Sequence, residues 1–394
     1  MARYLFAWEL GGNYGHVGRC LPVALALREC GHQVLFAVRD LRIATEQLGP
    51  SGLRCVQAPV WGTTPSRYSP ANYAEMLLVE GYADWQRLWG VLQGWVSLLQ
   101  IYRPDVLVAD HAPTALLARR IVDVPAIAVG TGFEIPPDTA PLPSIRPWEP
   151  IAHERLRASE CQALAVINRA LGSYAAAPLD RVAGLFDVED RILATFAELD
   201  HYGLRPGAAY VGASFGCIPG MPIDWERGPG PHLLAYLRPA GRGFDEMLSA
   251  LARLDAEVIC VAPGLARNPC SRSGMRVLAR PVELKPILGQ TQLAVTNAGA
   301  GMTAQLLLAG VPLVLLPNVI EQSLTARRAE ALGAAIVLVD ARSESSCVHA
   351  LTTGLKEPEY CDRARAFAAK HAEFSPQQVT DCVARAALAC LPTI

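Results

Sequence analysis

The sequence lacks a long uninterrupted apolar run. Its longest apolar stretch, around residues 306–316, is broken by Gly310 and Pro312, whereas a membrane-spanning helix needs about 20 consecutive apolar residues. The first residues enter a predicted strand directly and show no signal-peptide pattern. We therefore expect a soluble, cytoplasmic protein with no stable membrane span.

The sequence also lacks an excess of charge of one sign. It has 35 Lys and Arg against 37 Asp and Glu, a formal net charge of −2. Chains that bind nucleic acids or anionic membranes usually carry a marked positive excess. The composition therefore argues against a nucleic-acid partner, and it does not indicate an oligomeric state.

No cysteine motif is present, although cysteine occurs 11 times. The sequence has no Cys-x-x-Cys pair and no cysteine at a metal-like spacing from histidine. Scattered cysteines in odd number are typical of reduced thiols in a cytosolic protein. We expect neither a metal site nor a resident cofactor.

Short apolar segments alternate with predicted helices along two parts of the chain. In the first part, strands are predicted at 4–8, 34–38, 53–56, 106–110 and 126–129, with helices over 21–30 and 113–121. In the second part, strands are predicted at 233–237, 258–261, 276–278, 293–296, 313–316 and 335–339, with a helix over 324–332. Such alternation is typical of a parallel sheet covered by helices on both faces.

We therefore predict an α/β protein with two Rossmann-like, doubly wound domains facing a central cleft. A chain of 394 residues is long enough for two domains. The expected division is 1–205 for the N-terminal domain, 206–231 for a linker and 232–374 for the C-terminal domain. Ser375 followed by Pro376 predicts the start of a last helix, so residues 375–394 are expected to pack back on the N-terminal domain.

Residues 69–102 form a predicted helical region rich in tyrosine and tryptophan. Most of these side chains are expected to pack in the core against the sheet. The alternative is that one face of the region, including Trp85, lines a pocket for an apolar or aromatic ligand.

In the second half, a glycine-rich turn joins a strand to a helix over residues 295–303. Glycines let the backbone approach a ligand, and the N–H groups of a helix start favour a phosphate. A tight turn also needs glycine for structural reasons alone. After the next strand, Glu321 and Gln322 offer adjacent acceptor and donor groups that suit sugar hydroxyls, although such a pair can also open a solvated helix.

In the first half, His16 follows the first strand and Asp110 ends a later one. The carboxyl ends of parallel strands lie at one edge of the sheet, so the two side chains can meet there. Histidine has a suitable pKa to take a proton at neutral pH, and a carboxylate on its other nitrogen fixes the tautomer. We predict His16 as general base and Asp110 as its orienting residue. Of the other histidines, His111 is a weaker candidate, and turn or surface positions are expected for His32, His201 and His349.

Three segments together resemble the family 1, UDP-glycosyltransferase-like enzymes of bacterial natural-product type. They are Gly-Gly-Asn-Tyr-Gly-His-Val near the start, Pro-Asp-Val-Leu-Val-Ala-Asp at 104–110, and Thr-Asn-Ala-Gly-Ala-Gly-Met-Thr from 296 with the Glu-Gln pair that follows. The resemblance implies the GT-B fold and metal-independent use of a UDP- or dTDP-sugar. It also implies that the N-terminal domain binds the acceptor and the C-terminal domain binds the nucleotide sugar.

Candidate site residues follow from this resemblance. The candidate donor-binding residues are Asn297, Gly299, Ala300, Gly301, Met302, Thr303, Gln305, Glu321, Gln322, Arg238 and Val282. The candidate acceptor-binding residues are Asn13, Tyr14, Trp85 and Phe133. The expected reaction inverts the anomeric centre and glycosylates a hydroxyl of a small apolar or aromatic acceptor, with His16 as base.

The sequence departs from the family pattern at four places. Asn297 stands where the family has a donor-phosphate histidine, and Pro281 where a tryptophan stacks on the base. Arg238 lies in a segment that replaces Ser-Leu-Gly-Ser, and it can supply the charge lost at Asn297. Gln305 replaces the family's ribose-binding acid.

Four other functions stay open at this point. The first loop is also similar to that of the N-acetylglucosaminyltransferase of peptidoglycan synthesis, so a lipid-linked acceptor is one alternative and a protein acceptor another. A nucleotide-sugar 2-epimerase shares the fold. A non-catalytic GT-B partner protein would explain the changes at Asn297 and Pro281.

Overall fold

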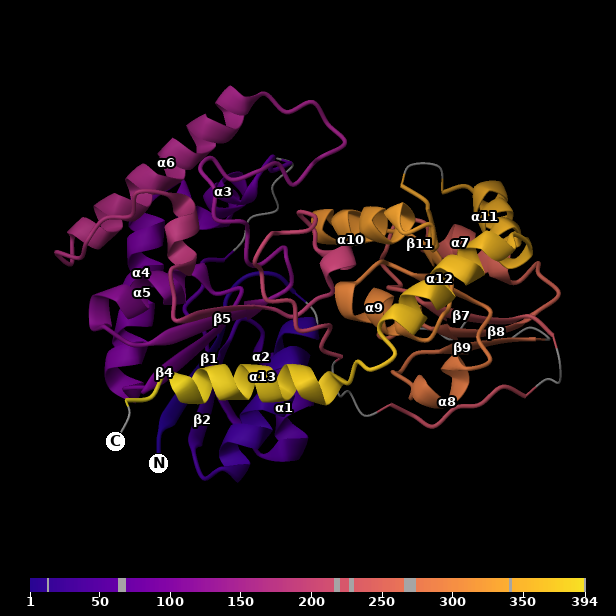
Figure 1. Ribbon diagram of the computed structural model, residues 1–394, viewed down its shortest axis with the longest axis horizontal. Helices are drawn as coiled ribbons and strands as arrows, with labels where there is room; N and C mark the ends of the chain where they lie inside the picture. The colour runs from indigo at the N-terminus through magenta and orange to yellow at the C-terminus, as the bar shows by residue number, and fades with distance from the viewer. Residues whose placement is uncertain are drawn as a thin grey trace. The chain divides into compact units, whose positions relative to one another are not determined.

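The computed structural model describes residues 1–12, 14–62, 69–215, 220–226, 230–265, 274–339 and 342–392. The chain divides into two compact units (Figure 1). The N-terminal unit comprises Met1–Ala197, Leu204–Cys217 and Ser375–Ile394, and the C-terminal unit comprises Glu198–Gly203 and Ile218–Phe374. The chain therefore passes between the units more than once.

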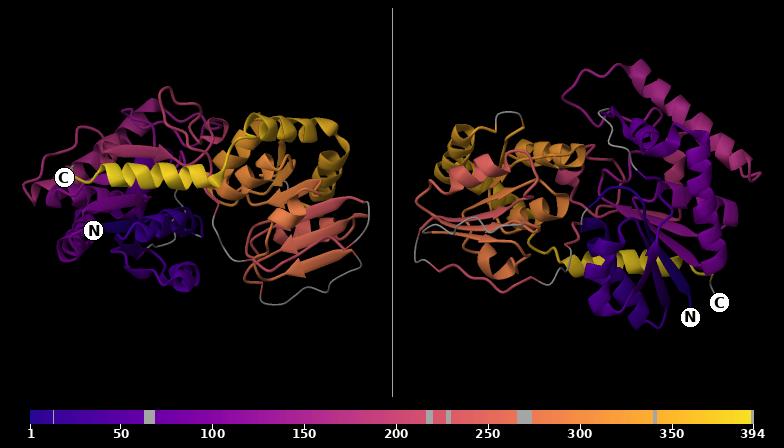
Figure 2. Two further views of the ribbon diagram at one scale, coloured as in Figure 1. Left: turned by 60° about the horizontal axis from the view of Figure 1, so that its bottom comes forward. Right: turned by 180° about the vertical axis from the view of Figure 1, so that it is seen from behind.

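The N-terminal unit contains a parallel sheet with the strand order β3-β2-β1-β4-β5-β6. Its strands are β1 (Arg3–Trp8), β2 (Gln33–Val38), β3 (Arg54–Gln57), β4 (Val106–Asp110), β5 (Ala126–Gly130) and β6 (Asp190–Leu193). Its helices are α1 (Gly15–Glu29), α2 (Leu41–Leu48), α3 (Tyr73–Leu77), α4 (Trp85–Tyr102), α5 (Pro113–Val122), α6 (His153–Gly172) and α13 (Pro376–Ala389). Helix α1 contacts α2 and α13, and α4 contacts α5 and α6, so helices cover both faces of the sheet (Figures 1 and 2).

The predicted helical region over 69–102 is made of α3, a π-helical turn at Leu78–Tyr82, and α4. Tyr73 and Trp95 are fully buried in the core of the N-terminal unit. The core interpretation is therefore correct for these two aromatic side chains.

The C-terminal unit contains a second parallel sheet, with the order β12-β11-β10-β7-β8-β9. Its strands are β7 (His232–Tyr236), β8 (Glu257–Val261), β9 (Met275–Leu278), β10 (Leu293–Thr296), β11 (Leu313–Leu315) and β12 (Ala335–Val337). Its helices are α7 (Phe244–Leu251), α8 (Lys285–Leu288), α9 (Ala300–Leu308), α10 (Ile320–Ala331), α11 (Glu344–Lys356) and α12 (Pro358–Lys370). The two sheets confirm the predicted α/β class.

Two helices begin earlier than the sequence pattern predicts. Helix α1 starts at Gly15 and runs through Pro22, because burial of Val17 and Cys20 outweighs the preference of proline for a first turn. Helix α10 starts at Ile320. His16 therefore lies in the first turn of α1, and the Glu-Gln pair lies in the first turn of α10. The loop before each helix positions these side chains.

In its described part, the segment predicted as a linker, 206–231, forms one backbone bridge to β6 and another to the loop after β9. Tyr210 pairs with Leu193 at the end of β6, and Met221 pairs with Val282. Gly220 lies so close to this second bridge that a Cβ atom there would come within 2.2 Å of the Val282 carbonyl carbon.

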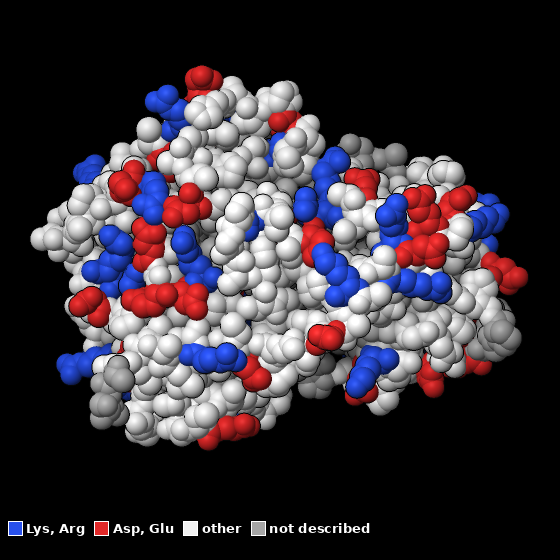
Figure 3. Space-filling view, viewed as in Figure 1, with Lys and Arg blue, Asp and Glu red and all other residues white. Residues whose placement is uncertain are grey.

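Charged side chains of both signs are interspersed over the face shown in Figure 3, in keeping with the net charge of −2. Within the described ranges, no helix has both the length and the apolar character needed to cross a membrane.

Candidate active site

His16 and Asp110 lie where the strand order of the first sheet reverses. Strand β1 pairs with β2 on one side and with β4 on the other, and doubly wound sheets bind ligands outside the carboxyl ends of their strands at such a position. Asp110 ends β4, and His16 lies in the first turn of α1. His16 Nδ1 is 2.7 Å from Asp110 Oδ1, and both side chains are buried. The structure thus brings the predicted pair together.

The loop between β1 and α1 fits closely around His16. Gly11 has φ = +80°, and a Cβ atom there would lie 2.5 Å from His16 Nε2, so only glycine fits. The Leu10 N–H donates to the carbonyl of His111 (2.9 Å), and the Trp8 indole N–H donates to the carbonyl of Leu10 (2.8 Å). Because the carboxylate holds Nδ1, Nε2 is the ring atom left to accept a proton.

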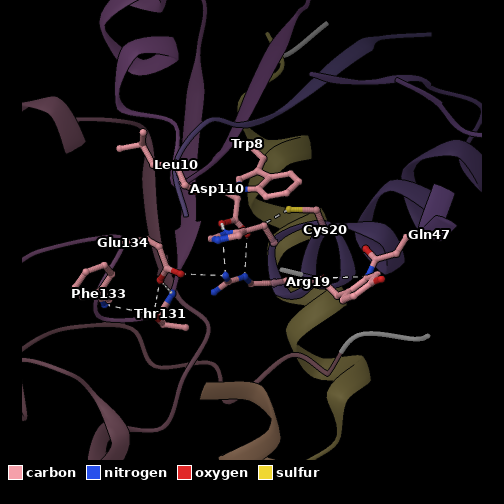
Figure 4. A network of polar contacts seen from close by, with 11 residues as sticks. Trp8, Leu10, Arg19, Cys20, Gln47, Asp110, Thr131, Phe133 and Glu134 are labelled. Atoms are coloured by element: carbon pink, nitrogen blue, oxygen red, sulfur yellow. Dashed lines mark hydrogen bonds and ion pairs between the residues drawn. The ribbon is translucent and has the colours of Figure 1, made fainter. Parts of the chain in front are cut away.

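Arg19 and Glu134, which the sequence analysis missed, extend the pair into a buried network (Figure 4). Arg19 Nε donates to Asp110 Oδ2 (2.9 Å), and its Nη2 donates to Glu134 Oε1 (3.3 Å). Glu134 also accepts from the N–H and the hydroxyl of Thr131. The sequence contains a signal for Arg19, because it stands three residues after His16 and so shares its helix face. That signal depends on a helix that starts at Gly15.

The network makes His16 a stronger base than an ordinary histidine. Burial lowers the pKa of His16, but the charge and hydrogen bond of Asp110, together with Glu134, outweigh burial and raise that pKa above 6.5. Burial raises the pKa of Glu134, but the charges of Arg19, His16 and His111 and the hydrogen bond from Thr131 together outweigh burial and lower that pKa well below its usual range. Glu134 is therefore an anion at neutral pH.

His111 and Phe133 form an aromatic border of the site. His111 has φ = +49°, which is uncommon for a residue other than glycine and often marks a functional site. Its ring centre lies 6.0 Å from that of His16 and 6.1 Å from that of Phe133. Burial lowers the pKa of His111 to about 4, so this ring is neutral at pH 7. Phe133 thus lies where an acceptor-binding residue is predicted.

The structure describes two of the other three predicted acceptor-binding residues. Asn13 is outside the described residues. The Tyr14 hydroxyl donates to Glu46 of α2 (2.6 Å). The Trp85 ring packs under the guanidinium of Arg169 on α6, at 4.6 Å. Trp85 therefore belongs to the packing of α4 against α6.

A small, partly open pocket lies in the N-terminal unit. Leu10, Trp61 and Tyr82 are among its lining residues, and Trp85 is not. Leu10 also belongs to the loop around His16, whereas His16 itself is not among the lining residues. Trp61 and Tyr82 are therefore the aromatic residues that line this pocket.

His16, Asp110 and Glu134 offer atoms within 4.8 Å of one another, a spacing that could suit a metal ion. The guanidinium of Arg19 already binds both carboxylates, and His16 Nδ1 is bonded to Asp110. The donor set is therefore satisfied by the protein itself and does not fit a metal centre.

In the C-terminal unit, Asn297 fastens the ends of three neighbouring strands. It follows β10, where the second sheet reverses its order. Its Oδ1 accepts the N–H of Arg238 after β7 (2.8 Å), and its Nδ2 donates to the carbonyl of Leu316 after β11 (3.0 Å). This buried amide thus has a structural role that the sequence did not reveal. The side chain of Arg238 is exposed at the same edge.

The start of α9 presents backbone N–H groups at this edge. The Thr303 N–H donates to Gly299 (2.9 Å), whereas the N–H groups of Ala300, Gly301 and Met302 precede the first intrahelical bond. The side chain of Thr303 is fully buried. The contact of its hydroxyl with the donor stays a prediction. In the next turn Gln305 is half-buried.

The Glu-Gln pair lies in the first turn of α10. Gln322 is buried, and its Oε1 accepts the N–H of Asn318 (2.8 Å), which leaves its NH2 group as the donor for a ligand. Glu321 is half-buried beside it. The two residues flanking Val282 bond to the backbone of Met221, so the N–H and C=O of Val282 face away from Met221.

Comparison with solved structures defines the fold of the whole chain. The calicheamicin glycosyltransferase CalG4 superposes with a TM-score of 0.74 and 20% identity, covering 98% of each chain. The spinosyn rhamnosyltransferase SpnG, in complex with thymidine diphosphate, gives 0.71 at 18% identity over 97% of this chain and 100% of that one. SnogD from Streptomyces nogalater gives 0.66 at 17% identity over 98% and 99%. The chain therefore has the GT-B fold of these natural-product glycosyltransferases.

A family model narrows the description of the C-terminal unit. Residues 245–385 match the C-terminal domain described as erythromycin biosynthesis protein CIII-like. No curated protein matches the chain. The chain thus combines an EryCIII-like C-terminal domain with the GT-B fold of bacterial natural-product glycosyltransferases.

Proposed function

We propose that this protein transfers a sugar from a UDP- or dTDP-sugar to a hydroxyl of a small apolar or aromatic acceptor, with inversion and without a metal. The observation that carries the proposal is the buried pair of His16 and Asp110 at the reversal of the first sheet. An unactivated hydroxyl is a poor nucleophile, and a base within hydrogen-bond reach accelerates its attack. The EryCIII-like domain supports the same reaction class.

The acceptor side of the reaction belongs to the N-terminal unit. Nε2 of His16 takes the proton of the acceptor hydroxyl as its oxygen attacks the anomeric carbon. Asp110 holds the other ring nitrogen, fixes the tautomer and stabilises the imidazolium. Attack opposite the leaving nucleotide inverts the anomeric configuration and needs no covalent sugar intermediate.

The donor side belongs to the C-terminal unit. The N–H groups of Ala300, Gly301 and Met302 bind the diphosphate and stabilise its charge as it leaves. Glu321 and the NH2 group of Gln322 bind sugar hydroxyls. The solved complex of SpnG with thymidine diphosphate favours a thymidine nucleotide.

Three further donor contacts complete this proposal. The N–H and C=O of Val282 pair with the base, Gln305 binds the ribose, and the exposed Arg238 attracts the diphosphate. The free thiols of the described cysteines suit a cytoplasmic enzyme.

The acceptor is a small molecule with an apolar ring. Trp61, Tyr82 and Leu10 line the pocket of the N-terminal unit, and the ring of Phe133 lies beside that of His111, which in turn lies beside that of His16. SpnG, which has the same fold, has been solved with spinosyn aglycone, and this supports a small-molecule acceptor.

The test is incubation with a panel of nucleoside-diphosphate sugars, reading thermal stabilisation and slow release of nucleotide. His16→Ala is expected to keep its fold and donor binding and to lose roughly 10²–10⁴-fold in transfer rate. His153→Ala, an exposed position at the start of α6, is the control and should retain the wild-type rate. Full activity of His16→Ala with an aliphatic alcohol would overturn the base assignment. Epimerised donor would identify an epimerase, and failure of every nucleotide sugar to bind would identify a non-catalytic partner.

A further inference from the structure

Arg19 joins two buried carboxylates that come from different parts of the chain. It contacts Asp110 at the end of β4 (2.9 Å) and Glu134 after β5 (3.3 Å). The exposed fractions of the three side chains are 8%, 2% and 2%. Charges this well removed from water interact strongly, because solvent screens them little.

Glu134 is held in place by its own loop. Its Oε2 accepts the N–H of Thr131 (2.6 Å) and the Thr131 hydroxyl. A Cβ atom on Gly130 would lie 2.9 Å from the Glu134 Cβ, so the backbone leaves room for this side chain. Arg205 donates to the carbonyls of Ile135 and Gly132 (2.6 and 2.9 Å), which fixes the loop on both sides of Glu134.

The charges acting on His16 can be counted. Asp110 and Glu134 each carry −1 and Arg19 carries +1, whereas the buried thiol of Cys20 has a raised pKa and the ring of His111 a lowered one, so both are neutral. With a neutral imidazole the network therefore carries −1. When His16 gains a proton, the network becomes neutral. Proton uptake thus cancels the net buried charge of the network. Protonation of a buried imidazole without these neighbours would instead create an uncompensated charge.

We propose that Arg19 and Glu134 are positioning residues that set the basicity of His16 by opposing charges. Glu134 makes proton uptake by His16 favourable, and Arg19 limits that effect while it holds Asp110 in place. This inference rests on the proposed function, because it assigns these residues to the base of that reaction. Neither residue needs to touch the substrate.

A purely structural role would give a different result. If Arg19 and Glu134 only fastened α1 to the loop after β5, removing either would loosen His16 in the same way. The charge mechanism requires opposite effects on the pKa of His16. Removal of Glu134 must lower that pKa, and removal of Arg19 must raise it.

The experiment is an NMR titration of the His16 imidazole in the full-length protein, without substrate. Glu134→Gln is expected to lower the pKa of His16 by about one pH unit, and Arg19→Gln to raise it by about the same amount. Arg19→Lys keeps the charge and should stay close to wild type. Glu160→Gln is the matched control, because Glu160 is also buried and accepts the N–H groups of Leu142 and Val182 (2.7 and 3.0 Å). In this variant the pKa of His16 should equal that of the wild-type protein.

The pH dependence of sugar transfer is the second measurement. For Glu134→Gln the rise in rate should move to lower pH, and the rate at high pH should fall on the order of threefold to tenfold as the base weakens. For Arg19→Gln the rise should move to higher pH. If Glu134→Gln does not fold, a raised His16 pKa in Arg19→Gln still supports the charge mechanism, because loosening of the His16–Asp110 pair would lower that pKa and a lowered value would overturn the inference.

The outcomes separate this inference from the proposed function. Equal or same-direction pKa shifts in Glu134→Gln and Arg19→Gln would overturn the inference even if the protein transfers sugar. Opposite shifts would support it even if no transfer is found, in which case the base assignment to glycosyl transfer fails alone. An unchanged His16 pKa in both variants would also overturn it.

Discussion

His16 acquires its basicity from residues far away in the chain. Its partner Asp110 is 94 positions distant, and Trp8 stacks on its other side at 5.3 Å. The result is a ring with one nitrogen held by a carboxylate and one nitrogen beside Gly11. Every residue-scale expectation about the reaction depends on this arrangement.

The transfer rate should rise with pH through one ionisation. His16 acts as a base only when neutral, and its pKa is raised above 6.5, so the rise is expected above that value. His111 does not contribute above pH 5, because its pKa is lowered to about 4. Initial rates between pH 5 and 9, with an acceptor that does not titrate there, give the measurement. A rate that falls across this range would contradict the assignment of His16.

Gln322→Ala should weaken binding of the nucleotide sugar more than binding of the bare nucleoside diphosphate. The lost NH2 group contributes on the order of 1 kcal/mol to sugar recognition. The variant also loses the bond from the Asn318 N–H, which would affect both ligands alike. Calorimetry with thymidine diphosphate and its sugar conjugate separates the two effects. An equal loss of affinity for both ligands would indicate that Gln322 has only a structural role and would contradict its contact with the sugar.

At the scale of elements, the first turn of α5 is held by Glu9, a buried residue that directly follows β1. The N-cap residue of α5 provides no side-chain hydrogen bond. Instead Glu9 accepts the N–H of Thr114 (2.8 Å) and the Thr114 hydroxyl, and Tyr82 bonds to the same hydroxyl (2.7 Å). One carboxyl group thus joins β1, α5 and the turn before α4. Glu9, Thr114 and Tyr82 also line the small pocket of the N-terminal unit.

This acid gives a testable dependence of stability on pH. Burial raises the pKa of Glu9 from 4.5 to about 7, so between these values the folded protein holds a proton that the unfolded chain has lost. Its contribution to stability is therefore present below pH 4.5 and declines as the pH rises to about 7. Urea unfolding at pH 5 and 8 should show Glu9→Gln gaining stability relative to wild type at the higher pH. The control Glu160→Gln is expected to change in stability between the two pH values as the wild type does. The same behaviour of Glu9→Gln would contradict the role of Glu9.

At the scale of the whole molecule, the last helix belongs to the first unit. The chain leaves the C-terminal unit after Phe374, and α13 begins with a capping box formed by Ser375 and Gln378. Helix α13 then contacts α1 and β5. The N-terminal unit is therefore completed only after the rest of the chain has been made.

Val383→Asp should destabilise the N-terminal unit selectively. Val383 is buried on α13, and an unpaired buried charge costs roughly 3–5 kcal/mol. In a thermal scan, thymidine diphosphate should raise the transition of the C-terminal unit, and the variant should lower the other transition. Leu388→Asp makes the same change at a position that is 36% exposed and should have little effect. A loss confined to the nucleotide-sensitive transition would contradict this assignment.

Local patterns in the sequence were enough to predict the two sheets and the location of the candidate site residues at strand ends. Alternating strands and helices predicted the two parallel sheets, since burial on both faces demands short apolar strands. The same signals placed His16, Asp110 and the N–H groups after β10 at strand ends, where doubly wound sheets bind ligands. These features depend on residues that are neighbours in the chain.

Only the tertiary structure decided which side chains complete the sites. Arg19 reaches Asp110 and Glu134 across 91 and 115 positions, and no local pattern records that contact. The Asn297 amide joins the ends of three neighbouring strands, and the Thr303 side chain is buried, because other strands and helices pack around these two residues. Contacts between distant segments form only when the sheets assemble, so their energies do not appear in the periodicity of the sequence.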